Sequence, residues 1–101
     1  MLLYEVELAV EAGIAEAFRA WLPGHVAELL ALPGFVSAEI LAVEEPAPPP
    51  GEVALCVRYR LRDRATLDAY LRDHAARLRG DGLARFGGRF RASRRVLAPL
   101  G

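Results

Sequence analysis

The sequence predicts an α+β fold in which two helices cover one face of a four-stranded antiparallel sheet. Segments with the alternating pattern of strands and segments with helical spacing follow one another in the order β-α-β-β-α-β. The chain has 101 residues, of which 53% are hydrophobic and 26% are charged. That length and composition suit a globular protein with one core, so we expect residues 1–101 to form a single domain.

The first expected strand covers residues 2–11, "LLYEVELAVE". Apolar residues such as Tyr4, Val6 and Leu8 alternate there with Glu5 and Glu7, as in a strand that is buried on one face. Gly13 ends this pattern.

A helix follows from Ile14 to the "LPGF" at residues 32–35. Its core-facing residues recur at steps of three or four and are Phe18, Leu22, His25, Leu29 and Leu32. Pro23 and Gly24 lie inside this pattern, so we expect a kink or a helix in two pieces.

Two strands come next, over residues 35–45 and 52–62, with a proline-rich loop at 46–51 between them. In the second of these, Val57, Tyr59 and Leu61 share one face.

Asp63 is the expected N-cap of a second helix that ends at Gly80. Its apolar stripe is Leu67, Leu71, His74 and Leu78. We interpret Gly82 as a second helix-ending residue and Gly87–Gly88 as the turn into a last strand over residues 89–100. The glycine spacing at 80–88 follows a helix and not a strand, so it is not a dinucleotide-binding motif.

Composition narrows the function classes. All 13 basic residues are arginine, and they balance 13 acidic residues, so the long-range attraction of a nucleic-acid-binding protein is missing. No apolar run approaches the ~20 residues that span a bilayer. The single cysteine, Cys56, excludes an internal disulfide and fits a reducing compartment, and we expect a cytoplasmic protein.

The topology predicts a cluster of polar and aromatic side chains between the helices and the sheet. The first and third strands are expected to pair antiparallel, which brings Tyr4 next to Tyr59. The cluster comprises Tyr4, Trp21, His25, Tyr59, Tyr70 and Arg94. Such a set would suit a planar or anionic ligand, with His25 as a catalytic general base. Alternatively, these are ordinary core residues whose polar tips reach water or backbone.

The other face of the sheet is expected to carry paired charges. Glu5, Glu7 and Glu11 lie on a strand between two strands rich in arginine. Cross-strand ion pairs would account for the segregation of eight acidic residues into residues 1–50 and of twelve arginines into residues 51–101. Cys56 shares this face, where positive charge could lower the pKa of its thiol.

Six stretches together resemble a bacterial domain-of-unknown-function family, catalogued as 4286, and cover most of the chain. They are "YEVELAV", "AFRAWLPGHV", "LPGFVSAEIL", "VRYRLRD", "LDAYLRDHAARLR" and "RFGGRFRASRRVL". That family looks like a member of the dimeric α+β barrel superfamily. The resemblance implies a ferredoxin-like fold and a homodimer that packs through the open face of the sheet.

The superfamily includes cofactor-free monooxygenases, muconolactone isomerase-like enzymes and haem-degrading enzymes. The haem degraders carry a ligand histidine on the second helix, which His74 matches. Their companion asparagine on the first strand is replaced here by Tyr4, Glu5 or Val6, and their second-helix tryptophan is missing, because the only tryptophan is Trp21. We therefore expect no haem, although His74 stays in the set of candidate pocket residues. His25 and His74 lie on helices that are expected to run in opposite directions, too far apart to bind one ion, so we expect no metal and no other cofactor either.

The sequence thus predicts an uncharacterised small cytoplasmic α+β barrel protein with a binding or interaction role and a possible small-molecule ligand. The alternative is a cofactor-independent, monooxygenase- or isomerase-like enzyme that acts on a small aromatic or anionic compound. Neither nucleic acid nor a membrane is expected as a partner.

Overall fold

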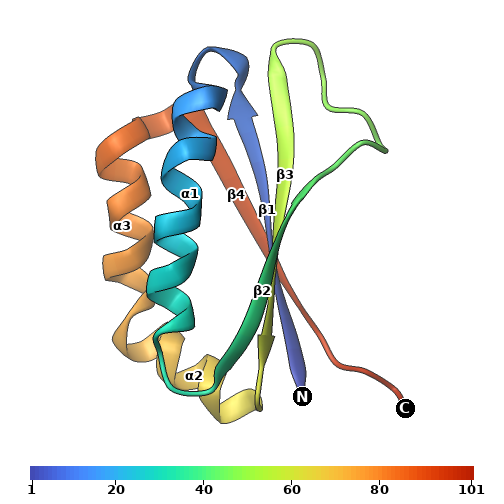
Figure 1. The fold of residues 1–101 in the computed structure, drawn as a ribbon, viewed down its shortest axis with the longest axis vertical. Helices are drawn as coiled ribbons and strands as arrows, with labels where there is room; N and C mark the ends of the chain where they lie inside the picture. The colour runs from blue at the N-terminus through green and yellow to red at the C-terminus, as the bar shows by residue number, and fades with distance from the viewer.

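The computed structural model describes residues 1–101, and its centre is a four-stranded antiparallel sheet. The strands are β1 (Leu2–Glu11), β2 (Phe35–Ala42), β3 (Glu52–Leu61) and β4 (Phe90–Leu97). They lie in the order β2-β3-β1-β4, so the first and third strands form the middle of the sheet (Figure 1). This is the ferredoxin-like α+β arrangement that the sequence predicts.

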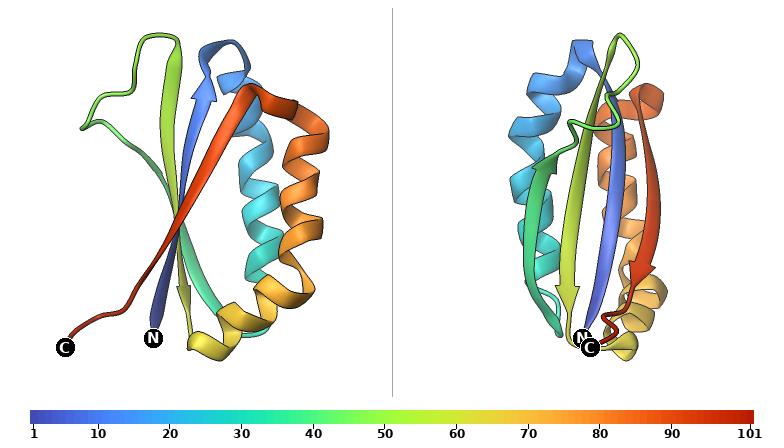
Figure 2. Two further views of the ribbon diagram at one scale, coloured as in Figure 1. Left: turned by 180° about the vertical axis from the view of Figure 1, so that it is seen from behind. Right: turned by 90° about the vertical axis from the view of Figure 1, so that its right-hand side faces the viewer.

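Three helices cover one face of the sheet and leave the other face open (Figure 1). They are α1 (Ala15–Leu30), α2 (Arg64–Asp73) and α3 (Ala75–Phe86). The side view in Figure 2 places α1 behind β2 and β3, and α3 behind β1 and β4. None of the helices combines the length and the apolar character needed to cross a membrane.

Cross-strand register decides which residues face the helices. Tyr4 on β1 is paired with Tyr59 on β3 and with Val96 on β4, and Val6 is paired with Val57 and Arg94. Side chains alternate between the two faces, so the even-numbered residues of β1 point toward the helices. They form the core together with the buried side chains of the helices, among them Phe18, Leu22, Leu67 and Leu78.

The expected break in the first helix does not occur. Helix α1 runs from Ala15 to Leu30 with Pro23 inside it. Pro23 and Gly24 lie on the exposed side, whereas Leu22 and Val26 before and after them are buried in the core. Pro23 cannot donate a backbone hydrogen bond, so the helix lacks one bond at this point. Core packing of the residues before and after the proline keeps the helix continuous.

The expected second helix is two helices, and it extends beyond its predicted end. Asp63 caps α2 as expected, because its carboxylate accepts hydrogen bonds from the backbone N–H and the hydroxyl of Thr66, both at 2.9 Å. His74 leaves the helical conformation between α2 and α3. Gly80 and Gly82 lie inside α3 and do not end a helix, so that prediction is wrong; the turn into β4 is formed by Gly87–Arg89.

The break at His74 also changes which residues are buried. Tyr70 and Leu67 face the core from α2, whereas Leu71 of the predicted stripe is 44% exposed. The core contacts of α3 come from Ala75, Leu78, Gly82 and Phe86.

Gly34 is required in the connection between α1 and β2. Its φ angle is +86°, a conformation that side chains strongly disfavour. A Cβ atom there would also collide with the side chain of Thr66. The start of β2 is therefore pressed against the N-terminus of α2, and only glycine fits between them.

Candidate functional site

A cavity of about 270 Å³ lies between the helices and the covered face of the sheet. It brings together all six residues of the expected cluster, namely Tyr4, Trp21, His25, Tyr59, Tyr70 and Arg94. Of its 18 lining residues, 14 are hydrophobic, so a bound molecule would meet mainly apolar walls with a few polar groups.

Three tyrosines form one end of the cavity. The rings of Tyr4 and Tyr59 are stacked with centroids 5.9 Å apart, and the edge of Tyr70 meets Tyr4 at the same separation. All three side chains are nearly inaccessible to solvent. Burial raises the pKa of Tyr59 and that of Tyr70 above the ordinary range, because a phenolate would be poorly solvated there. The phenols of Tyr59 and Tyr70 are therefore neutral hydrogen-bonding groups at neutral pH.

Trp21 and His25, one turn apart on α1, form another part of the wall. Their rings are stacked with centroids 4.5 Å apart. Burial lowers the pKa of His25, and the nearby charges of Glu28 and Asp81 oppose this effect only in part. The Nδ1 atom of His25 is buried and has no hydrogen-bond partner. A neutral imidazole with one free nitrogen can accept a proton or a hydrogen bond.

Two guanidinium groups line the cavity, and the sequence predicts only one of them. Arg94 is expected there from the parity of β4. Arg79 on α3 also lines the cavity, and its Nη2 donates a hydrogen bond to the phenolic oxygen of Tyr4 at 3.1 Å. Its Nε is buried without a partner. Neither arginine forms an ion pair, and no carboxylate lines the cavity.

Arg79 could have been found from the helical spacing alone. It lies one position after the buried Leu78 and three before Gly82, on the edge of the apolar stripe of α3. The expectation that this helix ends at Gly80 placed Arg79 in a fraying last turn, and this concealed its position.

Gly82 makes room for the aromatic wall. A Cβ atom at this position would lie 3.2 Å from the indole of Trp21 and 3.3 Å from the ring of Phe90. These approaches are tighter than ordinary van der Waals contacts, so any side chain on Gly82 would displace one of the two rings.

His74 does not line this cavity, contrary to the expectation that it belongs to the ligand pocket. It occupies the junction between α2 and α3, where its Nδ1 lies 3.3 Å from Nη2 of Arg77 at the surface. In a continuous helix, His74 would face the core with the predicted apolar stripe. The helix changes direction at this residue, and its side chain therefore lies at the surface.

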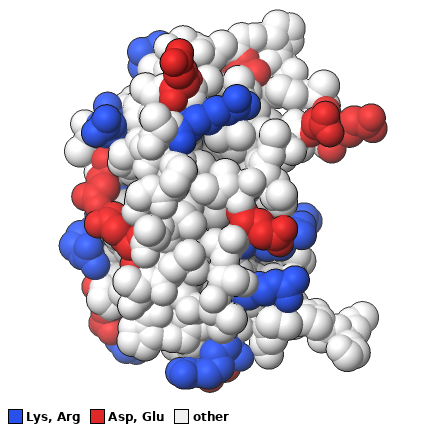
Figure 3. All heavy atoms as spheres, viewed as in Figure 1, with Lys and Arg blue, Asp and Glu red and all other residues white.

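The open face of the sheet holds the expected charge pairs at Glu5 and Glu11, whereas Glu7 forms no ion pair. Glu5 is only 1% exposed because two guanidiniums flank its carboxylate, with Arg58 Nε at 2.7 Å and Arg95 Nε at 2.8 Å. Their hydrogen bonds and charges lower the pKa of Glu5. Glu11 pairs with Arg89 in the same way, at 2.7 Å. On the side of the molecule seen in Figure 3, acidic and basic side chains are interspersed and form no large area of one sign.

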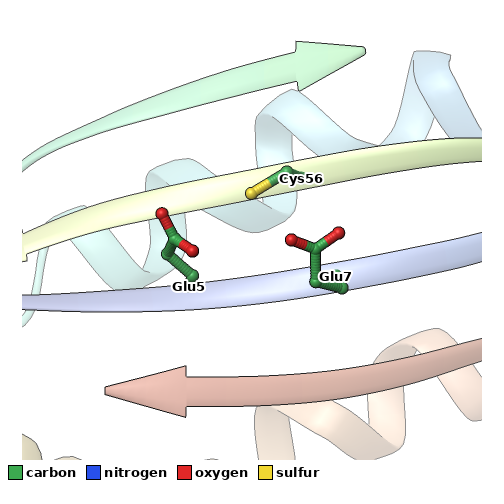
Figure 4. Close-up of side chains that lie close together, drawn as sticks. All are labelled: Glu5, Glu7 and Cys56. Carbon is green, nitrogen blue, oxygen red and sulfur yellow. The ribbon is translucent and has the colours of Figure 1, made fainter. Parts of the chain in front are cut away.

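Figure 4 shows Glu5, Glu7 and Cys56 side by side on β1 and β3. Their ligand atoms lie within 4.8 Å of one another, and neither His25 nor His74 belongs to such a group. Burial and the two carboxylates raise the pKa of Cys56 to about 11; Arg58 lowers it, as expected of a nearby positive charge, but is outweighed. A protonated thiol and a carboxylate already held by two arginines are a poor ligand set for a metal ion.

The comparisons with known proteins agree with the fold. A family model described as a domain of unknown function (DUF4286) matches residues 1–100. No curated protein sequence matches the chain significantly.

Several solved structures have the same fold over nearly the whole chain. An antibiotic biosynthesis monooxygenase is 16% identical, with a TM-score of 0.70 and 100% of both chains covered. SnoaB, a cofactor-independent oxygenase from Streptomyces nogalater, is 12% identical, with a TM-score of 0.69 and coverage of 99% of this chain and 94% of the other. Rv0793 from Mycobacterium tuberculosis is 23% identical, with a TM-score of 0.61 and coverage of 100% and 97%. At these identities the likeness shows the fold alone.

Proposed function

The chain belongs to the DUF4286 family, and we propose that it is a binding protein for a small aromatic anion, which it holds in the cavity between the helices and the sheet. One observation carries this proposal. Arg79 and Arg94 contribute two positive charges to a mainly apolar cavity, and no carboxylate lines the cavity to neutralise them. Arg94 is exposed, whereas Arg79 is only partly exposed and its Nε is buried without a partner. An unpaired charged group in apolar surroundings is costly, and an anionic ligand at Arg79 would offset that cost.

The aromatic part of the ligand follows from the walls. Stacked and edge-on rings of Tyr4, Tyr59, Tyr70 and Trp21 surround the space. Their faces and edges favour a planar ring system in offset or edge-to-face contact. The volume of about 270 Å³ lies just below the usual range for ligand sites, which begins at roughly 300 Å³. A molecule of one or two rings is therefore the expected size.

Isothermal titration calorimetry with 2-naphthoate and its neutral analogue 2-naphthamide tests the proposal. We expect the carboxylate to bind at least about tenfold more tightly, because charge-assisted hydrogen bonds to arginine contribute roughly 1.5–3 kcal/mol. Arg79→Gln and Arg94→Gln should each reduce this preference. Arg77→Gln is the matched control, because Arg77 lies on the same helix but at the surface and outside the cavity. Equal affinities for the two compounds, or no saturable binding of either, would contradict the proposal.

A second candidate is a cofactor-independent enzyme that forms the aromatic anion in the cavity. It is favoured by His25, a neutral imidazole whose Nδ1 is buried and unpaired. In this case Nδ1 would take a proton from an acidic C–H or O–H group, and the charges of Arg79 and Arg94 would stabilise the resulting enolate or aryloxide. Most residues that would carry such chemistry are the same ones that would bind an anion supplied from outside.

Base chemistry can be tested separately from binding. 2-Tetralone is a bicyclic ketone whose acidic C–H bonds exchange with solvent through an enolate. Proton NMR in D2O should show exchange above the buffer rate with the wild-type protein and none above it with His25→Ala. Equal exchange in the variant would exclude His25 as the base, and equal melting temperatures would verify that both proteins are folded.

The open face of the sheet supports a homodimer as the form in which this protein acts. Several of its charged groups are already paired within the chain, as the ion pairs of Glu5 with Arg58 and Arg95 illustrate. Paired charges cost less to bury than unpaired ones. A second copy that packs its own open face on this one would remove both sheets from solvent, as sheets in two-layer proteins do.

A cytoplasmic location is also part of this proposal. Cys56 is the only cysteine and is a free, buried thiol. A chain without a disulfide needs no oxidising compartment.

A further inference from the structure

We infer that the ligand carries a second polar group, a hydroxyl at the end of its ring system remote from the acid, so that the cavity selects hydroxylated aromatic acids over plain ones. This inference rests on the proposed function and adds to it the class of ligand. It follows from two buried, unpaired polar atoms in residues that line the cavity, Nε of Arg79 on α3 and Nδ1 of His25 on α1.

The two polar groups come from different parts of the fold. His25 lies on α1, which packs against β2. Arg94 lies on β4, at the opposite edge of the sheet from β2, and Arg79 lies on α3, which covers that edge (Figure 2).

The charges around His25 also differ from those around the tyrosines and arginines. The charges that act on His25 are those of Glu28 and Asp81, and neither Arg79 nor Arg94 is among them; both arginines act on Tyr70, as does Tyr4. Arg79 is hydrogen-bonded to Tyr4 in the tyrosine cluster, whereas His25 is stacked on Trp21, so the guanidinium of Arg79 and the imidazole occupy different parts of one cavity. A single acid group would satisfy the arginines and leave the imidazole nitrogen unpaired.

A hydroxyl is the group that suits His25. The neutral imidazole can carry its proton on either nitrogen, so Nδ1 either accepts or donates. A hydroxyl can both donate and accept, and it satisfies both tautomers. A second carboxylate would lie close to the charges of Glu28 and Asp81, which disfavour an anion at this end.

The stacking of His25 on Trp21 fixes the direction of the unpaired nitrogen. The two rings are 23° from parallel, and Trp21 is itself packed against Phe18 and Phe86. A ring held in this way loses little side-chain entropy when a ligand binds, so one added hydrogen bond should appear as affinity. Its expected effect is a threefold to tenfold gain, in keeping with the net free energy of about 0.5–1.5 kcal/mol for such a bond.

Calorimetric titration with 2-naphthoate and 6-hydroxy-2-naphthoate tests the inference. These acids share one ring system and one carboxylate and differ only in the remote hydroxyl. We expect the hydroxy acid to bind about threefold to tenfold more tightly to the wild-type protein. In His25→Phe, which keeps an aromatic ring next to Trp21, the ratio of the two dissociation constants should fall to about 1. Arg79→Gln should weaken both acids and leave their ratio above 1, and the surface control Arg77→Gln should change neither.

The outcomes separate the inference from the proposal on which it rests. If neither acid binds, the proposed function fails and the inference fails with it. If both bind with the same affinity, or if His25→Phe keeps the preference, only the inference is overturned. The comparison of the two acids needs no variant, so it stands even if a substitution in the cavity impairs folding.

Discussion

Arg79 on α3 donates a hydrogen bond from Nη2 to the phenolic oxygen of Tyr4 on β1 at 3.1 Å, across the cavity and 75 residues away in the chain. The same guanidinium leaves its Nε buried and unpaired. Nη2 of Arg79 is therefore held by Tyr4, while Nε still has a hydrogen bond to donate. An anion would meet a charge that is already held in position, which reduces the entropy lost on binding.

Replacing Arg79 with methionine should leave the stability of the ligand-free protein nearly unchanged. The change removes a buried unpaired donor, Nε, but it also takes the hydrogen-bond partner from the buried hydroxyl of Tyr4, and each such unsatisfied group costs roughly 1–3 kcal/mol. These effects oppose each other, and the apolar stem of the side chain is kept. We expect the free energy of unfolding in urea to change by less than about 1 kcal/mol, and Arg77→Met at the surface to change it by less than about 0.5 kcal/mol. A decrease of more than about 1 kcal/mol would mean that Arg79 serves the fold and not a ligand.

Glu5→Gln should lower stability at neutral pH by about 2 kcal/mol, because both arginine contacts lose their charge. The pKa of Glu5 is lowered in the folded protein. Its contribution is thus fully present above the unfolded-state pKa, near 4.5, and is lost as the pH falls through the lower folded pKa. Urea unfolding at pH 7 and pH 3 should show the difference between the two proteins narrowing in acid. A difference that is the same at both pH values would contradict this account.

Two glycine substitutions should have opposite effects. Gly80→Ala should stabilise the protein by about 0.5–1 kcal/mol, because Gly80 lies inside α3 and a Cβ atom there meets nothing within 4 Å. Gly34→Ala should destabilise it by more than about 2 kcal/mol, because a positive φ angle and contact with Thr66 both oppose a side chain. Thermal unfolding of the two variants measures both effects. If Gly80→Ala lowers the melting temperature, Gly80 is not an ordinary helix-interior residue.

The homodimer can be tested by placing a long charged side chain on the open face. Ser93 is exposed on β4 and is paired with Glu7 of β1 on that face. In size-exclusion chromatography with light scattering, we expect wild-type protein to have twice the mass of one chain and Ser93→Arg to shift toward the monomer. Ala76→Arg, an exposed change on α3, is the control and should remain dimeric. A wild-type monomer, or a dimer that tolerates Ser93→Arg, would exclude this face.

Residue periodicity predicted the strands well because each strand has one buried and one open face. The position of Arg94 toward the helices follows from strand parity, and the pairing of Tyr4 with Tyr59 follows from the antiparallel neighbourhood of β1 and β3 in the expected topology. Parity repeats every two residues and does not drift along a short strand. Parity and topology together therefore predicted that the polar groups of the sheet lie in the cavity.

The helices were predicted less well because tertiary packing overrides local signals there. Pro23 suggested a break where buried neighbours hold the helix together, and Gly80 suggested an end where α3 continues. His74 conforms to a helical stripe in sequence but ends α2 in space. The break at His74 explains why that residue was wrongly included in the cavity, whereas the expected helix end at Gly80 explains why Arg79 was missed.

Gly82 is a position at which one substitution would change the volume of the cavity. A Cβ atom there would press on Trp21 and Phe90 together, and both rings line the cavity. One substitution, from glycine to alanine, would therefore alter the shape of the site without touching any of its polar groups. Among descendants of this chain, a mutation in one codon could exchange one size of ligand for another while the charge recognition stayed the same. Gly82 is accordingly the position at which a redesign of selectivity should begin.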